Sequence, residues 1–189
     1  MAGNALIPDL KKAHSSMIRE TVEFRGEQTV IVDASQLHGF LKACFEAGFD
    51  YLVDISSLDH MGEDPRFEVV YELYSYSSHE HLRVRSEVPE ESCTMPTAID
   101  IWPTADWHER EIYDMMGILF SDHPDLRRIL MWDGYPFYPL RKDFPLEGKE
   151  SELPDVAFTG KAPLAGGPFV TSPGAASVKG REPRAKSVE

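Results

Sequence analysis

Residues that could support acid–base chemistry lie close together in the segment that begins at Asp106. Glu111 and Asp114 are three residues apart, so a helix would place them on nearly the same face. Two carboxylates held this close can raise one another's pKa, which is what general acid catalysis requires. The sequence shows no motif for a nucleophile, an oxyanion hole or a glycine-rich phosphate loop that would complete such a site. A helix surface with ion pairs, and with acidic residues near its N-terminus, explains these residues better than catalysis does.

The same segment contains residue types that bind metal ions, namely His108, Glu109, Glu111, Asp122 and His123. The order His-Glu-Arg-Glu-Ile differs from the His-Glu-x-x-His zinc motif, because Ile112 stands where the second histidine would share the helix face. The sequence therefore predicts no catalytic, cofactor-binding or metal-binding residue in this chain. A stand-alone metal-dependent hydrolase built on this cluster stays as a remote alternative, as does an unrelated scaffold or binding module.

The composition is that of a globular protein with one core. The chain has 189 residues, of which 42% are hydrophobic and 11% aromatic. Its formal net charge of −13 argues against nucleic-acid binding, which needs a basic surface. Six basic and five acidic residues lie in 148–189, so this tail has a net charge of about +1 and residues 1–147 have about −14. An acidic body suits docking against more basic protein surfaces, and it equally suits plain solubility.

The two cysteines and the apolar runs exclude further classes. Cys44 and Cys93 form no Cys-x-x-Cys pattern, whereas an iron–sulfur cluster usually takes four thiolates, so no cluster is expected here. We expect Cys44 to be a buried, inert thiol. The longest apolar runs, 51–55 and 129–132, fall far short of the roughly 18–20 residues that cross a bilayer. Residues 1–14 do not resemble a secretory signal, so a cytoplasmic location with membrane contact only through partners is expected.

Apolar periodicity and turn residues predict an α+β fold, with a small mixed or antiparallel sheet and helices packed on one face. The expected elements begin with a hairpin over 21–32 that turns at Gly26-Glu27 and a helix capped by Ser35 and stopped by Gly48. Strands follow over 49–58, 66–76 and 81–88. A short helix from Thr94 or Thr97 through Ile101 and a longer helix from Thr104 or Asp106 to Gly117 complete the expected elements. Apolar residues on both faces of 66–76 indicate an inner strand. Strict alternation over 81–88 indicates a sheet with one wet face.

Two charged segments follow the last expected helix. Residues 123–130 are expected to form a turn and a short helix that carries Arg127 and Arg128. One of these arginines is expected to pair with Glu109, Glu111 or Asp114, and the segment is expected to form part of a docking surface. Further along, prolines flank Arg141, Lys142 and Asp143, which predicts an extended stretch that presents its charges outward.

The character of the sequence changes after residue 147. Prolines and glycines interrupt every periodicity in 148–189, and apolar residues occur only singly. We therefore expect two parts, an α+β domain over 1–147 and an extended tail over 148–189. Residues 153–173 are expected to lie across neighbouring proteins, and residues after Ser177 are expected to be loose.

Four motifs in this order resemble the signature of one family. They are Glu-Arg-Glu-x-Tyr-Asp at 109–114, Gly-Ile-x-Phe at 117–120, His-Pro-Asp-Leu-Arg-Arg-Ile-Leu at 123–130 and Pro-Leu-Arg-Lys-Asp-Phe-Pro-Leu at 139–146. Over about residues 28–146 the chain resembles the 30 kDa subunit family, designated C, of NADH-quinone oxidoreductase, which is respiratory complex I. The residues carried over as signature and subunit-interface positions are Glu109, Arg110, Glu111, Tyr113, Asp114, His123, Arg127, Arg128, Arg141, Lys142 and Asp143.

This resemblance implies a structural role in an enzyme complex. It implies a small α+β domain in the hydrophilic arm, in the quinone-reducing module, beside the large quinone-site subunit (designated D) and its cluster-bearing neighbours. It implies no cofactor in this chain, with FMN and Fe–S clusters in partner subunits that pass electrons from NADH to quinone and translocate protons. The implied location is peripheral, on the cytoplasmic side of the cell inner membrane. The same motifs leave open an equivalent subunit of a membrane-bound hydrogenase or of a dehydrogenase with another electron donor.

Overall fold

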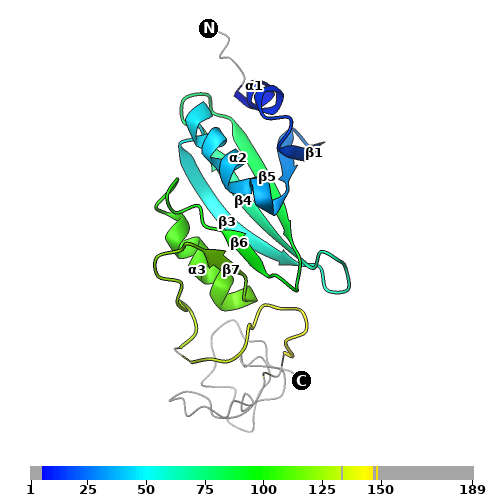
Figure 1. The fold of residues 1–189 in the computed structure, drawn as a ribbon, viewed down its shortest axis with the longest axis vertical. Coiled ribbons are helices and arrows are strands. Elements are labelled where there is room, and N and C mark those ends of the chain that lie inside the picture. The colour runs from blue at the N-terminus through cyan, green and yellow to red at the C-terminus, as the bar shows by residue number, and fades with distance from the viewer. Residues whose placement is uncertain (1–5, 133, 147, 149–189) are drawn as a thin grey trace, which may run out of the picture. The chain divides into compact units, whose positions relative to one another are not determined.

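The computed structural model describes residues 6–132, 134–146 and 148 (Figure 1). The chain divides into two compact units, Met1–Leu130 and Met131–Glu189. The first unit contains every helix and strand of the described residues. The expected division into 1–147 and 148–189 stays a prediction, and the expected path of 153–173 lies outside the described residues.

A five-stranded mixed sheet forms the centre of the first unit, with the strand order β1-β2-β5-β4-β3. The strands are β1 (Ile18–Phe24), β2 (Glu27–Val32), β3 (Tyr51–Asp59), β4 (Phe67–Tyr74) and β5 (His81–Val88). β2 and β5 pair in parallel, and the other neighbours pair antiparallel. Both edge strands carry an irregularity, at Arg19 in β1 and at Val53 in β3. The predicted mixed α+β fold and the inner position of β4 are confirmed.

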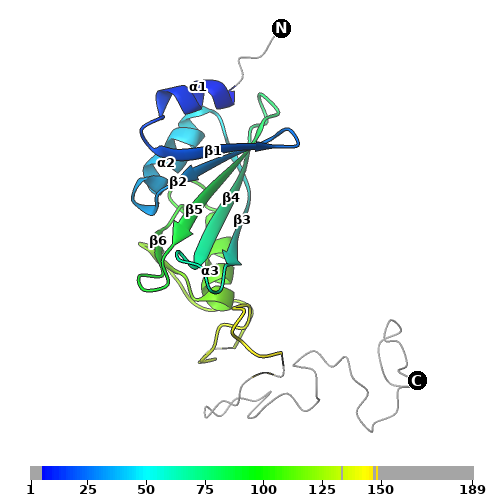
Figure 2. The same ribbon diagram turned by 90° about the vertical axis from the view of Figure 1, so that its right-hand side faces the viewer.

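The helix α2 (Ala34–Ala47) covers one face of this sheet (Figures 1 and 2). Its buried side chains recur at helical spacing and are Leu37, Phe40, Leu41, Ala43 and Cys44. Gly48 ends the helix with φ +117°, as predicted, since only glycine adopts this conformation without strain. The N-cap is Asp33 rather than Ser35, and Asp33 makes no side-chain capping bond. Ser35 lies inside the first turn.

The opposite face of the sheet carries charged side chains that pair with one another. β5 alternates strictly, with Leu82 and Val84 fully buried and Arg83 and Arg85 on the other face. Arg83 bonds Glu72 at 2.5 Å, and Arg85 bonds Glu68. These carboxylates raise the pKa of both arginines. The wet face predicted from the alternation is therefore present, and the charges on it neutralise each other.

The β1–β2 hairpin was predicted, but its turn is shifted by one residue. Phe24 pairs with Glu27, so the turn residues are Arg25 and Gly26, with φ +52° and +84°. Two positive φ angles match the right-handed twist of the strands. β1 is almost wholly exposed, and Phe24 is 64% exposed.

The helix expected over 94–101 was wrong. Thr94–Pro96 instead forms β6, which pairs in parallel with β7 (Leu119–Ser121) in a small second sheet. Met95 and Phe120 face each other in this pair and are nearly fully buried. The partner strand lies far along the chain, so local spacing could not reveal it.

Two further helices complete the first unit. α3 (Ala105–Met116) begins after Thr104 and ends at Gly117, with φ +75°, as predicted. It packs against β3. The helix α1 (Leu6–Ala13) was not predicted, and it packs on α2 with Ile7 and Leu10 buried. This helix was missed because it is short and contains a proline, although proline is tolerated in the first turn of a helix.

The described part of the second unit consists of turns and ring contacts. Trp132, Tyr135, Phe137 and Phe144 form a chain of neighbouring rings with centroids 4.7–6.0 Å apart. The amide of Phe144 donates to the carbonyl of Arg141, so 139–145 forms turns and is not extended as predicted. Proline fixes its own φ angle and restricts the preceding residue, and neither effect prevents a turn one or two residues away.

Candidate docking site on α3

The helix α3 carries five of the eleven signature residues and separates them onto two faces. Glu109 and Asp114 are fully buried, and Arg110 is 8% exposed. Trp107 is 64% exposed, and Glu111, one turn further on, is also exposed. Part of the charged signature therefore builds the fold, and the rest faces outward.

Glu109 connects α3 to the loop that precedes it. Its carboxylate accepts hydrogen bonds from the Thr97 hydroxyl at 2.6 Å and from the amide of Ala98 at 2.7 Å. Burial raises the pKa of Glu109 to about 7, although both hydrogen bonds oppose this shift. Tyr71 lies near this carboxylate, and burial, with a smaller contribution from Glu109, raises its pKa well above the usual value. Glu109 is thus a core residue in this structure.

Asp114 holds the loop that follows β7. Its carboxylate accepts a hydrogen bond from the Arg128 guanidinium at 2.5 Å and from the amides of Ile129 and Leu130 at 3.0 and 2.7 Å. Arg128 also donates to the carbonyl of Asp114 at 2.9 Å. The charge-assisted contacts fix both the side chain and the backbone of the loop. Arg128 therefore makes the internal pairing that was predicted for one of the two arginines. The short helix expected within 123–130 is wrong, because this segment has a turn at 124–125 followed by irregular backbone.

Arg110 holds the same loop from a second direction. Its Nε and one terminal nitrogen donate to the carbonyls of Arg127 and Arg128 at 3.2 and 3.3 Å. Its guanidinium carbon also lies 5.7 Å from the centre of the Trp107 ring. Two buried groups of α3, one acidic and one basic, thus hold complementary groups of one loop.

His123 is a structural residue in a turn. Its side chain is fully buried, and its Nδ1 accepts a hydrogen bond from the amide of Asp125 at 3.1 Å. The proton of the neutral ring therefore belongs on Nε2, which lies 3.4 Å from both the backbone and a carboxylate oxygen of Asp106. This arrangement fixes the start of the loop that Asp114 holds further along.

The outward-facing residues of this region are polar and apolar together. Arg127 has a 66% exposed side chain and pairs with the 60% exposed Asp125 at 2.7 Å. Leu130 is 61% exposed, and Tyr113 is half-buried.

The second unit has exposed charges of its own. Lys142 and Asp143 are exposed, and the guanidinium carbon of Arg141 lies 4.8 Å from the Tyr138 ring centre. Pro136, Phe137 and Phe144 line a shallow pocket with Arg141. The expectation that 141–143 presents its charges outward is therefore met for Lys142 and Asp143, although the backbone is turned.

The residue types that suggested a metal site are not gathered by the structure. His108 pairs with Asp54 of β3 at 3.1 Å, Glu109 faces Thr97, and His123 faces Asp106. Within residues 6–132, 134–146 and 148 no cluster of three or more His, Cys, Asp or Glu side chains is arranged to hold a metal ion. In that same part of the chain, no helix is both long and apolar enough to span a bilayer.

Three residues of this region were not identified from the sequence. Thr97 and Ala98 supply the donors for Glu109, and no local pattern links them to a residue more than ten positions away. Trp107 was overlooked because it follows Asp106 on the polar side of an amphipathic helix. A tryptophan on the polar side of an amphipathic helix is typical of a protein interface, so Trp107 could have been identified from the sequence.

Two solved structures have a similar fold. A trypsin-resistant fragment of Nqo5 matches with a TM-score of 0.59 and 33% identity, over 64% of this chain and 98% of that one. A chain in the membrane-bound sulfane sulfur reductase, an archaeal respiratory membrane complex, matches with a TM-score of 0.67 and 25% identity, over 75% of this chain and 84% of that one.

Sequence relatives define the family. The NADH-quinone oxidoreductase subunit designated C of Geotalea uraniireducens is 47% identical, over 79% of this chain and 92% of the relative. The protein of that name from Geobacter metallireducens is 42% identical, over 79% and 93%. The model of the respiratory-chain NADH dehydrogenase 30 kDa subunit matches residues 30–150. The chain belongs to this family, as the resemblance of its motifs predicted.

Proposed function

We propose that this chain is a structural subunit of the hydrophilic arm of NADH-quinone oxidoreductase and has no catalytic centre of its own. Two relatives that carry the name of this enzyme are 42% and 47% identical to it. The structural observation behind the proposal is the bonding of Asp114, a buried carboxylate used to hold the loop of Arg128. The buried acidic and basic side chains of α3 thus hold a loop in place and are not arranged for catalysis.

In this proposal, the partners carry the redox chemistry. FMN and Fe–S clusters of other subunits pass electrons from NADH to quinone. The neighbours of this chain are the large quinone-site subunit, designated D, and cluster-bearing subunits. The chain reaches the membrane only through them, on the cytoplasmic side, and binds no nucleic acid. The acidic composition, with a net charge of −13, supports docking against basic protein surfaces.

The signature residues divide into two roles within this proposal. The inner group holds loops and turns, and it consists of Glu109, Arg110, Asp114, His123 and Arg128. The outer group contacts partners, and it consists of the exposed Glu111, Arg127, Lys142 and Asp143 together with Tyr113 and Arg141. Within the first unit, the inner group keeps Glu111, Tyr113 and Arg127 in position for a partner.

Co-purification tests this proposal. An affinity tag on the chain should recover, from gently solubilised membranes, a complex that reduces quinone with NADH and contains flavin and Fe–S centres. Arg128→Glu should lower the amount of that complex, while the turnover of each assembled molecule stays unchanged, because the substitution disturbs a loop and not a redox centre. Recovery of the wild-type chain as a lone monomer would contradict the proposal, as would full assembly of the variant without turnover.

A second candidate is the equivalent subunit of a related respiratory complex with a different electron donor. The match to a chain of membrane-bound sulfane sulfur reductase is the observation that favours it. The donor distinguishes the two candidates. Purified complex that oxidises NADH supports the first, and complex that contains this chain but does not oxidise NADH supports the second.

A further inference from the structure

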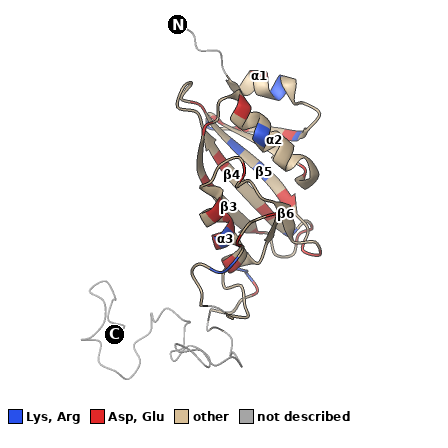
Figure 3. Cartoon of the chain, turned by 60° about the vertical axis from the view of Figure 1, so that its left-hand side comes forward, with Lys and Arg blue, Asp and Glu red and all other residues tan. Residues whose placement is uncertain are grey.

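The edge strand β3 and the helix α3 both carry exposed side chains, and the pair of Asp54 and His108 joins the two elements. The rings of Tyr51 and Tyr76 lie 5.4 Å apart, at the beginning of β3. Further along the strand, Asp54 bonds His108 of α3 at 3.1 Å. We call this strip the β3–α3 rim, and it consists of Tyr51, Val53, Asp54, Tyr76, Trp107 and Glu111. Figure 3 shows β3 and α3 side by side, with acidic positions on both.

Four side chains of the rim are aromatic or apolar and are exposed. Tyr51 and Val53 are each 43% exposed, Tyr76 is 59% exposed and Trp107 is 64% exposed. Tyrosine and tryptophan are enriched at the centres of protein interfaces. The open face of the sheet differs, because its charged side chains already pair with each other. The rim therefore fits a protein partner better than the open face of the sheet does.

The accessible charge along the rim is negative. The Asp54 side chain is 48% exposed, and Glu111 is exposed one helical turn from Trp107. The cation beside the Trp107 ring, Arg110, is only 8% exposed and donates to carbonyls of the loop that follows β7. A partner that approaches Trp107 therefore meets a largely exposed aromatic ring with the Glu111 carboxylate one helical turn away.

We propose that the β3–α3 rim docks an arginine-bearing segment of a neighbouring protein subunit. Arginine fits both features, since its guanidinium stacks on aromatic rings and bonds carboxylates in a bidentate manner. The bulge at Val53 disrupts the edge of β3, so the contact is made by side chains and not by an added strand. This inference rests on the proposed function, because it names the partner chemistry of the same subunit.

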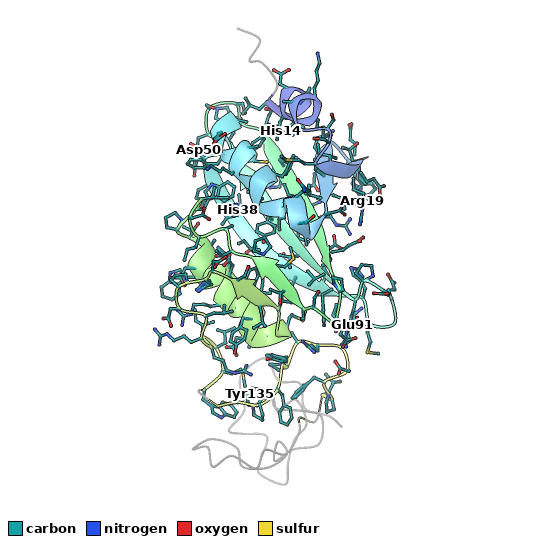
Figure 4. All side chains as sticks on the ribbon, viewed as in Figure 1. His14, Arg19, His38, Asp50, Glu91 and Tyr135 are labelled. Carbon is teal, nitrogen blue, oxygen red and sulfur yellow. The ribbon has the colours of Figure 1, made fainter. Side chains whose placement is uncertain are left out.

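Photo-crosslinking in the assembled complex tests the contact directly. Trp107 is replaced by p-benzoyl-phenylalanine, and Phe24 is replaced likewise as the matched control. Both native side chains are 64% exposed. Phe24 lies on β1, at the other edge of the sheet from β3, and Figure 4 labels Arg19 and Asp50 near these two edges. Residue 107 should cross-link to an arginine-bearing segment of another subunit. A product with a second copy of this chain, with lipid or with a segment lacking arginine would overturn the proposal, and so would the absence of any product.

Assembly of substituted chains gives an independent measurement. Trp107→Ala and Glu111→Arg should each lower the fraction of chain retained in the complex by roughly tenfold at raised salt. Phe24→Ala should leave it unchanged. The unfolding midpoint of each full-length variant should match the wild type, because both residues are exposed. If Trp107→Ala unfolds, Glu111→Arg carries the test alone.

The failure of this inference is distinguishable from failure of the proposed function. If the wild-type chain co-purifies with the redox complex while both rim variants assemble normally at every salt concentration, the rim proposal is wrong and the proposed function stands. If the wild-type chain never co-purifies, the proposed function fails, and the rim proposal falls with it.

Discussion

The Asp114 carboxylate and the Arg128 guanidinium meet at 2.5 Å, and their side chains are 0% and 11% exposed. A second pair, Asp125 and Arg127, lies wholly within the loop that Asp114 holds, and its side chains are 60% and 66% exposed. Both pairs join an aspartate to an arginine, but the first is buried and its carboxylate also accepts two backbone amides. The two aspartates therefore allow a buried, amide-supported pair to be compared with an exposed one.

Asp114→Asn should lower the free energy of unfolding by about 3 kcal/mol, because it leaves the Arg128 charge without its buried counter-charge and weakens two amide hydrogen bonds. Asp125→Asn should change it by less than about 0.5 kcal/mol, since water screens an exposed pair. Denaturant titration of the two full-length variants measures both values. Equal losses in the two variants would contradict the structural role given to Asp114.

Glu109→Gln should remove a pH dependence from the stability of the chain. The pKa of Glu109 is about 7 in the folded protein, above its ordinary value of 4.5. The contribution of Glu109 to folding stability is therefore greatest below pH 4.5, where the carboxyl is protonated in both states. That contribution is lost as the pH rises to about 7, because the unfolded chain ionises first. Glutamine stays neutral and can still accept from the Ala98 amide and donate to the Thr97 hydroxyl. At pH 8 the variant should exceed the wild type by up to about 3 kcal/mol.

Unfolding titrations at several pH values between 5 and 8 check this expectation. The difference in stability between variant and wild type should be small near pH 5 and should grow towards pH 7. Over that range Glu109 is ionised in the unfolded wild-type chain and largely protonated in the folded one. A difference that stays constant with pH would show that Glu109 is already charged in the folded chain at pH 5.

Two substitutions at His123 should have unequal effects. His123→Asn places an oxygen near the position of Nδ1, where it can accept from the Asp125 amide. His123→Gln cannot reach that amide with the same geometry. The glutamine variant should lose about 1–2 kcal/mol more stability than the asparagine variant. Thermal unfolding of the two variants, monitored by circular dichroism, makes the comparison, and the reverse order would assign the important contact to Nε2.

The Cys44 thiol should not react with a thiol reagent while the chain is folded. It is fully buried, and burial raises its pKa far above the usual value, so little thiolate is present. Cys93 is partly exposed and should react first. Mass spectrometry after alkylation in buffer and then in denaturant distinguishes the two sites. Rapid labelling of Cys44 in buffer would indicate that α2 opens readily.

The elements with local signals could be predicted from the sequence. α2 was visible in its apolar spacing and its glycine stop, and β5 in its strict alternation. The β6–β7 pair was missed because Met95 and Phe120 lie far apart in sequence, with α3 between them. A three-residue strand leaves no period that could distinguish it from a helix.

The site was predicted in its residues but not in their roles. Glu109 and Glu111 look alike in the sequence, although one is fully buried and the other exposed. The difference arises from donors on the loop before α3, which make burial of a carboxylate tolerable. Likewise, three acids were candidates for the arginine, and only the fold places Asp114 beside Arg128.

The parallel pairing of β2 with β5 affects the order in which the chain can fold during synthesis. Val30 pairs with Val84, and α2, β3 and β4 lie between them in the chain. The N-terminal hairpin leaves the ribosome well before the strand that joins it to the sheet. The hairpin therefore cannot pair with the rest of the sheet, and both of its edges stay exposed, until β5 has been synthesised. The antiparallel strands β3, β4 and β5 pair only with neighbours in sequence, so these three strands can form first. The β1–β2 hairpin then joins them by pairing with β5.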